Sequence, residues 1–367
     1  MKPTAKLHEL GQSLWLDNIT RTMLGDGTLK SYIDELSVTG LTSNPTIFDA
    51  AISAGDAYDQ QIAEVASSAE AGEGIGENVQ ERIFFELAVA DLQDACTLFA
   101  DVHARTAGVD GFCSLEVSPL LADQTEATIE QAAALHAKGQ RDNLFIKIPG
   151  TPAGLPAIEE TIFAGIPVNV TLLFDADQYL AAADAYMKGI ERRIEAGLDP
   201  FVASVASIFM SRWDVAVAET VPAELKDRLG LAVGFRAYRA YNELLASDRM
   251  RRLQNLGARP QRLLWASTGT KDPEAPDTLY IEGFASPFTV NTMPEKTLLA
   301  FADHGRIGDL VPADGGNCEL VLKEFGEAGI DVDALAQQLQ EEGKDKFVKS
   351  WEDLLESISS QPGVAAG

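Results

Sequence analysis

The sequence predicts an α/β protein built as a single (β/α)8 barrel of the TIM type, with extra helices added to it. Three observations lead to this fold class: eight short apolar segments, helical patterns between them, and polar residues near the ends of nearly all eight. Strands that alternate with helices are typically parallel and joined by crossovers. Eight such units favour a closed barrel over its structural rival, a doubly wound sheet.

The candidate strands are short apolar runs that follow one another along the chain. They are residues 13–19, 38–45, 112–119, 143–150, 167–174, 201–209, 262–269 and 286–294. Apolar residues at helical spacing predict helices between them at 79–105, 124–138, 177–195 and 231–246.

Three parts of the chain exceed what one crossover helix needs. Residues 46–111 follow the second strand and residues 210–261 follow the sixth, and both are long enough to hold inserted helices. Residues 295–360, after the eighth strand, carry further helical patterns. We therefore expect one barrel domain over residues 1–367, with helices inserted after strands two and six and at the C-terminus, and a loose tail at 361–367.

The chain is strongly acidic. Its 367 residues include 56 Asp and Glu against 29 Lys and Arg, which gives a formal net charge of −27. Such a surface repels nucleic acid, anionic membranes and, at long range, phosphorylated small molecules. We expect no nucleic-acid or membrane partner, and any phosphate site must be a local cluster of basic and N–H groups.

The cysteine content and the hydropathy pattern indicate the compartment. The three cysteines, Cys96, Cys113 and Cys318, cannot form a closed disulfide framework. No apolar run approaches the roughly 18 residues that a membrane-spanning helix needs. We therefore expect a soluble protein of the reducing cytoplasm.

Polar side chains within the apolar strands mark a candidate site. Barrel enzymes carry their reacting groups at the C-terminal ends of the strands, and side chains of a strand alternate between the barrel interior and the helix layer. In the fourth strand, Leu144, Ile146 and Ile148 suit the helix layer, which places Lys147 inside the barrel mouth. The same alternation places further polar residues there: Asp17, Thr42, Asn44, Glu116, Asn169, Thr171 and Ser207.

Two interpretations of Lys147 remain open at this point. A lysine is rarely buried without a partner, so Lys147 could be a structural ion-pair partner of Glu116 or Asp17. A desolvated lysine amine can instead attack a carbonyl group and form a Schiff base. The spacing of the residues does not decide between a structural and a chemical lysine.

Several motifs resemble the transaldolase family, in particular its larger bacterial subgroup. They are WLDN (15–18), TGLTSNPTIF (39–48), SLEVSP (114–119), IKIPGTPAGLPAI (146–158), GIPVNVTLLF (165–174) and WASTGTKDP (265–273). The resemblance implies a class I aldolase barrel without metal or other cofactor. It implies transfer of a dihydroxyacetone unit from sedoheptulose 7-phosphate to glyceraldehyde 3-phosphate, which gives erythrose 4-phosphate and fructose 6-phosphate in the non-oxidative pentose phosphate pathway.

The resemblance also implies roles for individual residues. It places the Schiff-base lysine at Lys147, the acid/base aspartate at Asp17, and at Glu116 the glutamate that moves protons through a water beside Thr171. The substrate-binding residues that it implies are Asn44, Asn169, Ser207 and, for phosphate, Arg212. Many family members carry a second phosphate-binding arginine after strand seven; here the chain offers Lys271 or the backbone of residues 267–269 instead.

Other functions compete with this one. Another lysine aldolase on the same scaffold would cleave fructose 6-phosphate and release free dihydroxyacetone. A sugar-phosphate binder without catalytic activity would need no reactive lysine. A metal-dependent aldolase would need histidines at the barrel mouth, whereas the four histidines do not fall at predicted strand ends. The sequence leaves a monomer and a homodimer equally open.

Overall fold

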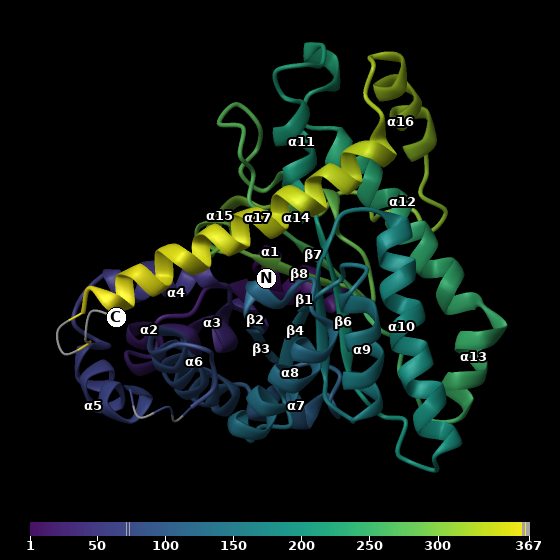
Figure 1. Ribbon diagram of the computed structural model, residues 1–367. Coiled ribbons are helices and arrows are strands. Elements are labelled where there is room, and N and C mark those ends of the chain that lie inside the picture. The colour runs from purple at the N-terminus through teal and green to yellow at the C-terminus, as the bar shows by residue number, and fades with distance from the viewer. Residues whose placement is uncertain (71, 73, 362–363, 365–367) are drawn as a thin grey trace.

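The barrel predicted from the sequence is present in the computed structural model, which describes residues 1–70, 72, 74–361 and 364. Eight parallel strands close in sequential order, each hydrogen-bonded to the next and β8 to β1 (Figure 1). All eight candidate strands are confirmed. Their bounds are β1 Ser13–Asp17, β2 Val38–Thr42, β3 Cys113–Glu116, β4 Leu144–Pro149, β5 Val168–Leu173, β6 Ser204–Phe209, β7 Arg262–Ala266 and β8 Val290–Met293.

Helices surround the barrel and fill the expected insertions. They are α1 Pro3–Glu9, α2 Arg21–Gly25, α3 Thr28–Leu36, α4 Pro45–Ser53, α5 Asp59–Glu70, α6 Val79–Leu98, α7 Ala100–Arg105, α8 Thr125–Gly139, α9 Gly154–Phe163, α10 Ala176–Glu195, α11 Ser211–Val217, α12 Leu229–Ala246, α13 Asp248–Asn255, α14 Leu279–Gly283, α15 Glu295–His304, α16 Cys318–Glu327 and α17 Val332–Ser359. Two short 3-10 helices, η1 Pro119–Leu121 and η2 Ala223–Leu225, complete the set within the described residues. The predicted extra helices after strands two and six are confirmed, and the helix expected over 79–105 is divided at Phe99.

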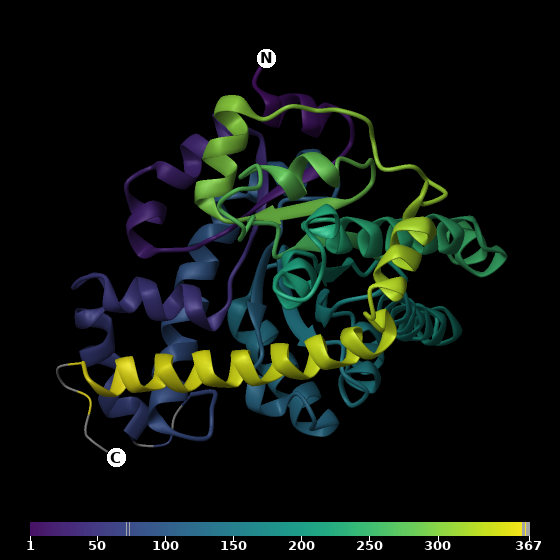
Figure 2. The same cartoon turned by 90° about the horizontal axis from the view of Figure 1, so that it is seen from above.

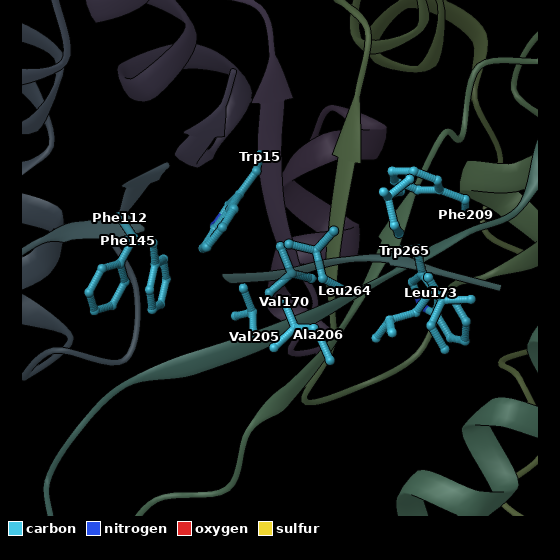
Figure 3. Close-up of a cluster of buried hydrophobic side chains, with 14 of the residues drawn as sticks. Trp15, Phe112, Phe145, Val170, Leu173, Val205, Ala206, Phe209, Leu264 and Trp265 are labelled. Carbon is cyan, nitrogen blue, oxygen red and sulfur yellow. The ribbon is translucent and has the colours of Figure 1, made fainter. Parts of the chain in front are cut away.

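Aromatic side chains fill the N-terminal part of the barrel interior. Phe112 and Phe145 stack with their ring centroids 4.1 Å apart, and Trp15 lies 6.0 Å from Phe145 (Figure 3). Gly40 on β2 leaves room for this indole, because a Cβ at Gly40 would lie 2.7 Å from Trp15. The polar residues two positions further along β1 and β4 share this inward face, so they point into the opposite, C-terminal mouth.

The C-terminal helix differs from what the sequence pattern indicated. The sequence shows two helical patterns here, DVDALAQQLQEEG (331–343) and KFVKSWEDLLESIS (346–359), whereas α17 is one continuous helix of 28 residues. It runs from α16 across the C-terminal side of the barrel to α4 (Figures 1 and 2). The Gln340 side chain donates to the Leu172 carbonyl at 2.9 Å, and a Cβ at Gly343 would lie 2.9 Å from the Leu172 side chain. Gly343 therefore allows α17 to lie close against the end of β5.

The domain boundaries stay a prediction. The described helices pack around a single barrel. The helix α17, for example, contacts the strand β5 and the helices α4 and α6. The loose tail expected at 361–367 falls mostly on residues 362–363 and 365–367, which lie outside the described residues.

Gly154 fixes the turn that follows the lysine-bearing strand. It begins α9, and a Cβ there would lie 1.9 Å from the carbonyl oxygen of Pro149, the last residue of β4. Gly154→Ala must displace backbone, so we expect it to lower the free energy of unfolding by about 1–3 kcal/mol. The measurement is urea unfolding followed by circular dichroism.

A matched control lies on α16. A Cβ at Gly326 would meet no atom within 4 Å, so Gly326→Ala should raise the free energy of unfolding by about 0.5–1 kcal/mol, the helical preference of alanine over glycine. Equal unfolding midpoints for Gly154→Ala and the unmodified protein would contradict the close approach.

Candidate active site

Polar side chains from most of the strands meet in a cavity of about 380 Å³ at the C-terminal end of the barrel. A cavity of this size suits a small-molecule substrate. Seven of the residues expected at the site line it: Asp17, Asn44, Lys147, Thr171, Ser207, Arg212 and Lys271. The other two, Glu116 and Asn169, lie behind this wall and hydrogen-bond to members of it.

Lys147 and Glu116 form a buried pair. Parallel pairing of β3 with β4 sets the two residues directly opposite each other. The Lys147 ammonium donates to Glu116 Oε2 at 3.0 Å and to the Ser43 carbonyl at 3.1 Å, and both side chains of the pair are almost fully buried. Burial raises the pKa of Glu116, and the adjacent Lys147 opposes that rise. The glutamate is therefore poised to exchange a proton with the lysine nitrogen or with a group bound to it.

Asp17 provides a second carboxylate on the other side of the cavity. Its Oδ1 accepts a hydrogen bond from Thr42 at 2.7 Å, and the Thr42 hydroxyl also lies 2.7 Å from that of Thr292. Burial raises the pKa of Asp17, whereas the bond from Thr42 and the charges of Lys147 and Lys271 lower it. Thr42 thus holds the carboxylate of Asp17 in one orientation at the cavity, where Asp17 is a lining residue.

A chain of hydrogen bonds connects β3, β5 and β6 beneath the cavity. Ser207 donates to Asn169 Oδ1 at 2.7 Å, and the Asn169 amide donates to Ser114 at 3.1 Å. Thr171 Oγ1 is buried at the cavity wall and has no hydrogen-bond partner among the residues that the structure describes. Since an unpaired buried hydroxyl costs free energy, Thr171 is a ready contact for a substrate hydroxyl or a water molecule.

Asn44 connects the cavity to a small void beside Glu116. Its side-chain oxygen caps α4 by accepting from the Ile47 backbone N–H at 3.1 Å, and no hydrogen bond from its amide nitrogen is found among the described residues. The void, of about 10 Å³, is lined by Asn44 and Glu116 and closed by Trp351. It has about the volume that one water molecule occupies. Thr171, in contrast, lines the larger cavity. The void therefore lies next to Glu116 on the side of Asn44, and not on the side of Thr171.

Two basic side chains form the outer wall of the cavity. Arg212 is the second residue of α11, just after β6, and its guanidinium makes no ion pair or hydrogen bond within the described part of the chain. Burial lowers the pKa of Arg212, and the negative charge of Glu342 opposes this. Lys271 lies in the loop after β7 and is exposed. An unpaired guanidinium in a concave wall matches the geometry of phosphate oxygens.

The loop after β7 brings backbone groups to the same wall. Ser267 and Gly269 line the cavity, and Ser267 has a φ of 54°, in the left-handed region that non-glycine residues rarely adopt. The Ser267 hydroxyl lies 2.8 Å from that of Ser211, and the Ser211 N–H donates to the Ser267 carbonyl at 3.0 Å. These bonds hold the strained residue in place next to Arg212.

The histidines lie away from this cavity. Each is on a helix: His8 on α1, His103 on α7, His136 on α8 and His304 on α15. Within the described ranges, no group of three or more His, Cys, Asp or Glu side chains is arranged to hold a metal ion. The described site is therefore an amine, two carboxylates and a basic wall.

Comparison with known proteins identifies the family to which this chain belongs. The model of the transaldolase/fructose-6-phosphate aldolase family matches residues 14–358. The chain belongs to this family. A transaldolase of Parafrankia sp. (strain EAN1pec) is 45% identical and covers all of this chain and 99% of its own length. A transaldolase of Arthrobacter sp. (strain FB24) is 44% identical over 97% of this chain and 96% of its own. "Transaldolase 2" of Streptomyces coelicolor is 43% identical with the same coverage.

One wall of the cavity in this transaldolase-family barrel was not predicted from the sequence. Phe347 of α17 lines the cavity, with its ring centroid 5.9 Å from the Lys147 ammonium and 6.3 Å from the ring of Phe209. The sequence shows only an amphipathic helix here, and nothing local indicates that one of its residues reaches a strand end. Thr42 and Thr292 were likewise not expected to contact the substrate, although Thr42 was placed on the correct face of β2.

None of the helices in the described ranges combines the length and the hydropathy required to cross a bilayer.

Proposed function

We propose that this chain is a transaldolase, which moves a dihydroxyacetone unit from sedoheptulose 7-phosphate to glyceraldehyde 3-phosphate. The observation that carries the proposal is the buried Lys147–Glu116 pair, whose lysine lines a cavity of about 380 Å³ together with Arg212, a guanidinium without an ion-pair partner among the described residues. A buried amine beside a proton-exchanging carboxyl is suited to Schiff-base chemistry. The products would be erythrose 4-phosphate and fructose 6-phosphate, as in the non-oxidative pentose phosphate pathway.

Formation of the Schiff base uses Lys147 and Glu116. The Lys147 nitrogen, once it has given up a proton, attacks C2 of the ketose and forms a carbinolamine. The C2 oxygen then leaves as water after it has gained a proton, which gives the iminium ion. Glu116 lies 3.0 Å from the lysine nitrogen, within the range that proton transfer requires, directly or through one water. Thr171 and the void beside Asn44 offer two positions for such a water.

Carbon–carbon cleavage uses Asp17. The carboxylate removes the proton of the C4 hydroxyl, the C3–C4 bond breaks, and its electron pair moves into the iminium to form an enamine. Erythrose 4-phosphate leaves. The enamine carbon then attacks the aldehyde of glyceraldehyde 3-phosphate, Asp17 returns the proton to the new hydroxyl, and water releases fructose 6-phosphate from Lys147. The phenyl ring of Phe347 over the lysine limits the access of water to the enamine between these two steps.

The remaining polar groups bind the substrate. Asn44, Ser207 and Thr171 lie around the lysine and are suited to the hydroxyl groups of the dihydroxyacetone unit. Asn169 positions Ser207 through their hydrogen bond at 2.7 Å. The phosphate lies at the outer wall, with Arg212 as its first ligand. Lys271 and the backbone of residues 267–269 take the place of the family's second arginine.

Arg212→Ala should weaken the binding of phosphorylated sugars. Loss of one charge-assisted hydrogen bond costs about 1.5–3 kcal/mol, or roughly 10- to 150-fold in KM. A donor without phosphate should lose much less, because it makes no use of the guanidinium. The measurement is steady-state kinetics with fructose 6-phosphate and with fructose as donors. Arg105→Ala, at an exposed arginine remote from the cavity, is the matched control. Equal losses for both donors would contradict the phosphate role.

A separate prediction concerns metal ions. The iminium ion is itself the electron sink, so a Lewis acid is redundant in the proposed reaction. We expect full activity after exhaustive dialysis against EDTA. Loss of activity in EDTA that zinc restores would contradict the Schiff-base mechanism.

The experiment that tests the function measures both activities of the family in one assay. With fructose 6-phosphate and erythrose 4-phosphate, a transaldolase should form sedoheptulose 7-phosphate and glyceraldehyde 3-phosphate. Without the acceptor aldehyde, turnover should stop at the enamine. Sustained release of free dihydroxyacetone in the absence of acceptor would instead identify a fructose-6-phosphate aldolase.

We also propose the cellular setting. The three cysteines are free and buried, which suits a reducing cytoplasm. The net charge of −27 disfavours nucleic acid and anionic membranes, so the partners are soluble sugar phosphates. The chain is expected to act as a monomer or a homodimer.

A further inference from the structure

A second cavity, of about 600 Å³, opens at the other end of the barrel. It is lined by residues at or before the N-terminal ends of the strands, among them Ser13 of β1, Ser204 of β6 and Arg262 of β7. The chemistry of barrel enzymes is confined to the C-terminal face, so this cavity is separate from the proposed reaction. Its volume lies within the range of ligand-binding pockets.

The deep part of this cavity is aromatic. Phe112 and Phe145 are stacked 4.1 Å apart in the barrel interior (Figure 3). They form the inner end of the cavity, and Tyr241 and Leu245 of α12 form a side. Apolar walls of this kind bind the hydrocarbon part of a ligand by removing it from water.

An exposed aromatic residue is held at the rim. Phe288 is 72% exposed and has a φ of 60°, in the left-handed region. Its carbonyl oxygen accepts from the Tyr241 hydroxyl at 2.9 Å, and its N–H donates to the Gly11 carbonyl at 2.9 Å. A left-handed conformation costs a non-glycine residue roughly 1–2 kcal/mol. Strain held in this way is characteristic of residues that contact a ligand.

Two guanidinium groups lie at the same cavity without a carboxylate partner among the described residues. Arg262 donates to the carbonyl oxygens of Thr289 at 2.9 Å and Val109 at 3.1 Å. Arg259 stacks over Phe201, 4.2 Å from the ring centroid, and its Nη1 is buried without a hydrogen-bond partner in the part of the chain that the structure describes. An unpaired buried donor on a cation costs free energy that an anionic ligand would recover.

The carboxylate in the cavity wall does not neutralise these cations directly. Asp110 accepts hydrogen bonds from the Trp15 indole at 2.7 Å, from the Gly111 N–H at 3.1 Å and from the Ser13 hydroxyl. Both carboxylate oxygens of Asp110 are thus occupied by hydrogen bonds at the N-terminal end of the barrel. Arg249, by comparison, pairs with both Asp184 and Glu191.

We propose that this second cavity is a binding site for a small amphipathic anion, with an aromatic or branched apolar body against Phe112 and Phe145 and its anionic group at Arg259. The site is independent of the proposed transaldolase reaction. The size, the apolar inner end and the unpaired guanidinium each point to this class of ligand.

The test uses the full-length protein and 1-anilinonaphthalene-8-sulfonate, an aromatic molecule with one sulfonate group. We expect saturable fluorescence with one site per chain. Arg259→Gln should weaken this binding by about tenfold or more, the effect of a lost charge-assisted contact. Arg251→Gln, at an exposed arginine that does not line the cavity, is the matched control and should leave binding unchanged.

Two further measurements make the test specific for the cavity. Val109 is 44% exposed at the cavity, and Val109→Trp should reduce binding of the probe by filling the entrance. The neutral analogue N-phenyl-1-naphthylamine should bind equally well to the unmodified protein and to Arg259→Gln. Transaldolase activity and circular dichroism confirm that each variant is folded.

The outcomes that would overturn the proposal are distinct. Absence of saturable binding would do so, as would binding that neither Arg259→Gln nor Val109→Trp changes. A third outcome is that a second copy of the chain covers the cavity. In that case sedimentation velocity would show a dimer that Phe288→Ser dissociates, and the probe would bind only after dissociation. None of these outcomes bears on the Schiff-base assignment, which rests on residues at the opposite end of the barrel.

Discussion

Replacing Lys147 with methionine is expected to abolish transaldolase turnover, with a loss of at least ~10⁴-fold in kcat, because no other group can form the covalent intermediate. The Lys147 nitrogen is buried in the cavity wall and lies between Glu116 and the Ser43 carbonyl. Methionine keeps most of the length and the apolar character of the side chain and lacks the amine, with a sulfur in place of Cδ. The measurement is the coupled assay with fructose 6-phosphate and erythrose 4-phosphate.

The same substitution has a structural consequence that must be separated from the chemical one. Without the ammonium, burial raises the pKa of Glu116 unopposed, and the carboxyl group becomes protonated more readily. Breaking a buried pair in this way costs up to about 3–5 kcal/mol of stability. The double variant Lys147→Met with Glu116→Gln removes both charges and should recover part of that loss. Both variants should be inactive, so a stable but inactive double variant excludes unfolding as the cause.

Borohydride trapping tests the covalent role directly. Reduction in the presence of fructose 6-phosphate should leave a three-carbon adduct on the peptide that contains Lys147. Lys344, which is paired with Asp123 and Glu341 on the surface, is an internal control and should remain unmodified. An adduct on a different lysine, or none at all, is the result that would refute the assignment.

Asp17→Asn and Glu116→Gln are expected to stop the reaction at different steps, each with a loss of about 10²–10⁴-fold in kcat. Asp17 lies on β1 beside Thr42, away from the lysine nitrogen, and is assigned to the C4 hydroxyl. Glu116 lies 3.0 Å from that nitrogen and is assigned to the imine steps. Asp17→Asn should therefore still form a Schiff base that borohydride traps, now as the uncleaved six-carbon adduct, but fail to release glyceraldehyde 3-phosphate from fructose 6-phosphate.

Glu116→Gln should behave in the opposite way. Its adduct should form slowly in a single-turnover experiment, because the proton transfers to and from the C2 oxygen lose their partner. Both substitutions are close in volume and hydrogen-bonding geometry to the native carboxylates, so differences between them reflect proton transfer. If Asp17→Asn blocks adduct formation and Glu116→Gln forms it at the normal rate, the two roles are reversed.

The raised pKa values of both carboxylates bear on how the rate depends on pH. A higher pKa leaves more of each carboxyl group protonated at a given pH, so as the pH falls the carboxylate form that accepts a proton is lost at a higher pH than for a solvent-exposed carboxyl group. The acidic limb of kcat for the unmodified protein should therefore lie above the ordinary range of carboxyl groups. The pH dependence of adduct formation by Asp17→Asn, measured in a single turnover, should retain only the contribution of Glu116.

The barrel and the central chemistry could be predicted from the sequence because both depend on local patterns. Strand alternation separates Leu144, Ile146 and Ile148 from Lys147 over a few residues, and the cavity contains Lys147 as expected. The apolar runs give the strands, and their sequential order follows from short right-handed crossovers. Once the order is known, neighbouring strands bring Glu116 of β3 and Lys147 of β4 together.

Other features were decided only by the tertiary structure, because they depend on contacts between segments far apart in the chain. Phe347 reaches Lys147 only because α17 continues past Gly343 without a break and crosses the mouth of the barrel. The pairing of Asp17 with Thr42 depends on the register of β1 and β2. Arg212 and Arg259 have no carboxylate partner among the described residues, because none of the many acidic side chains there is placed within reach of them. A sequence states the number of charges, whereas the packing of the whole barrel determines which charges meet.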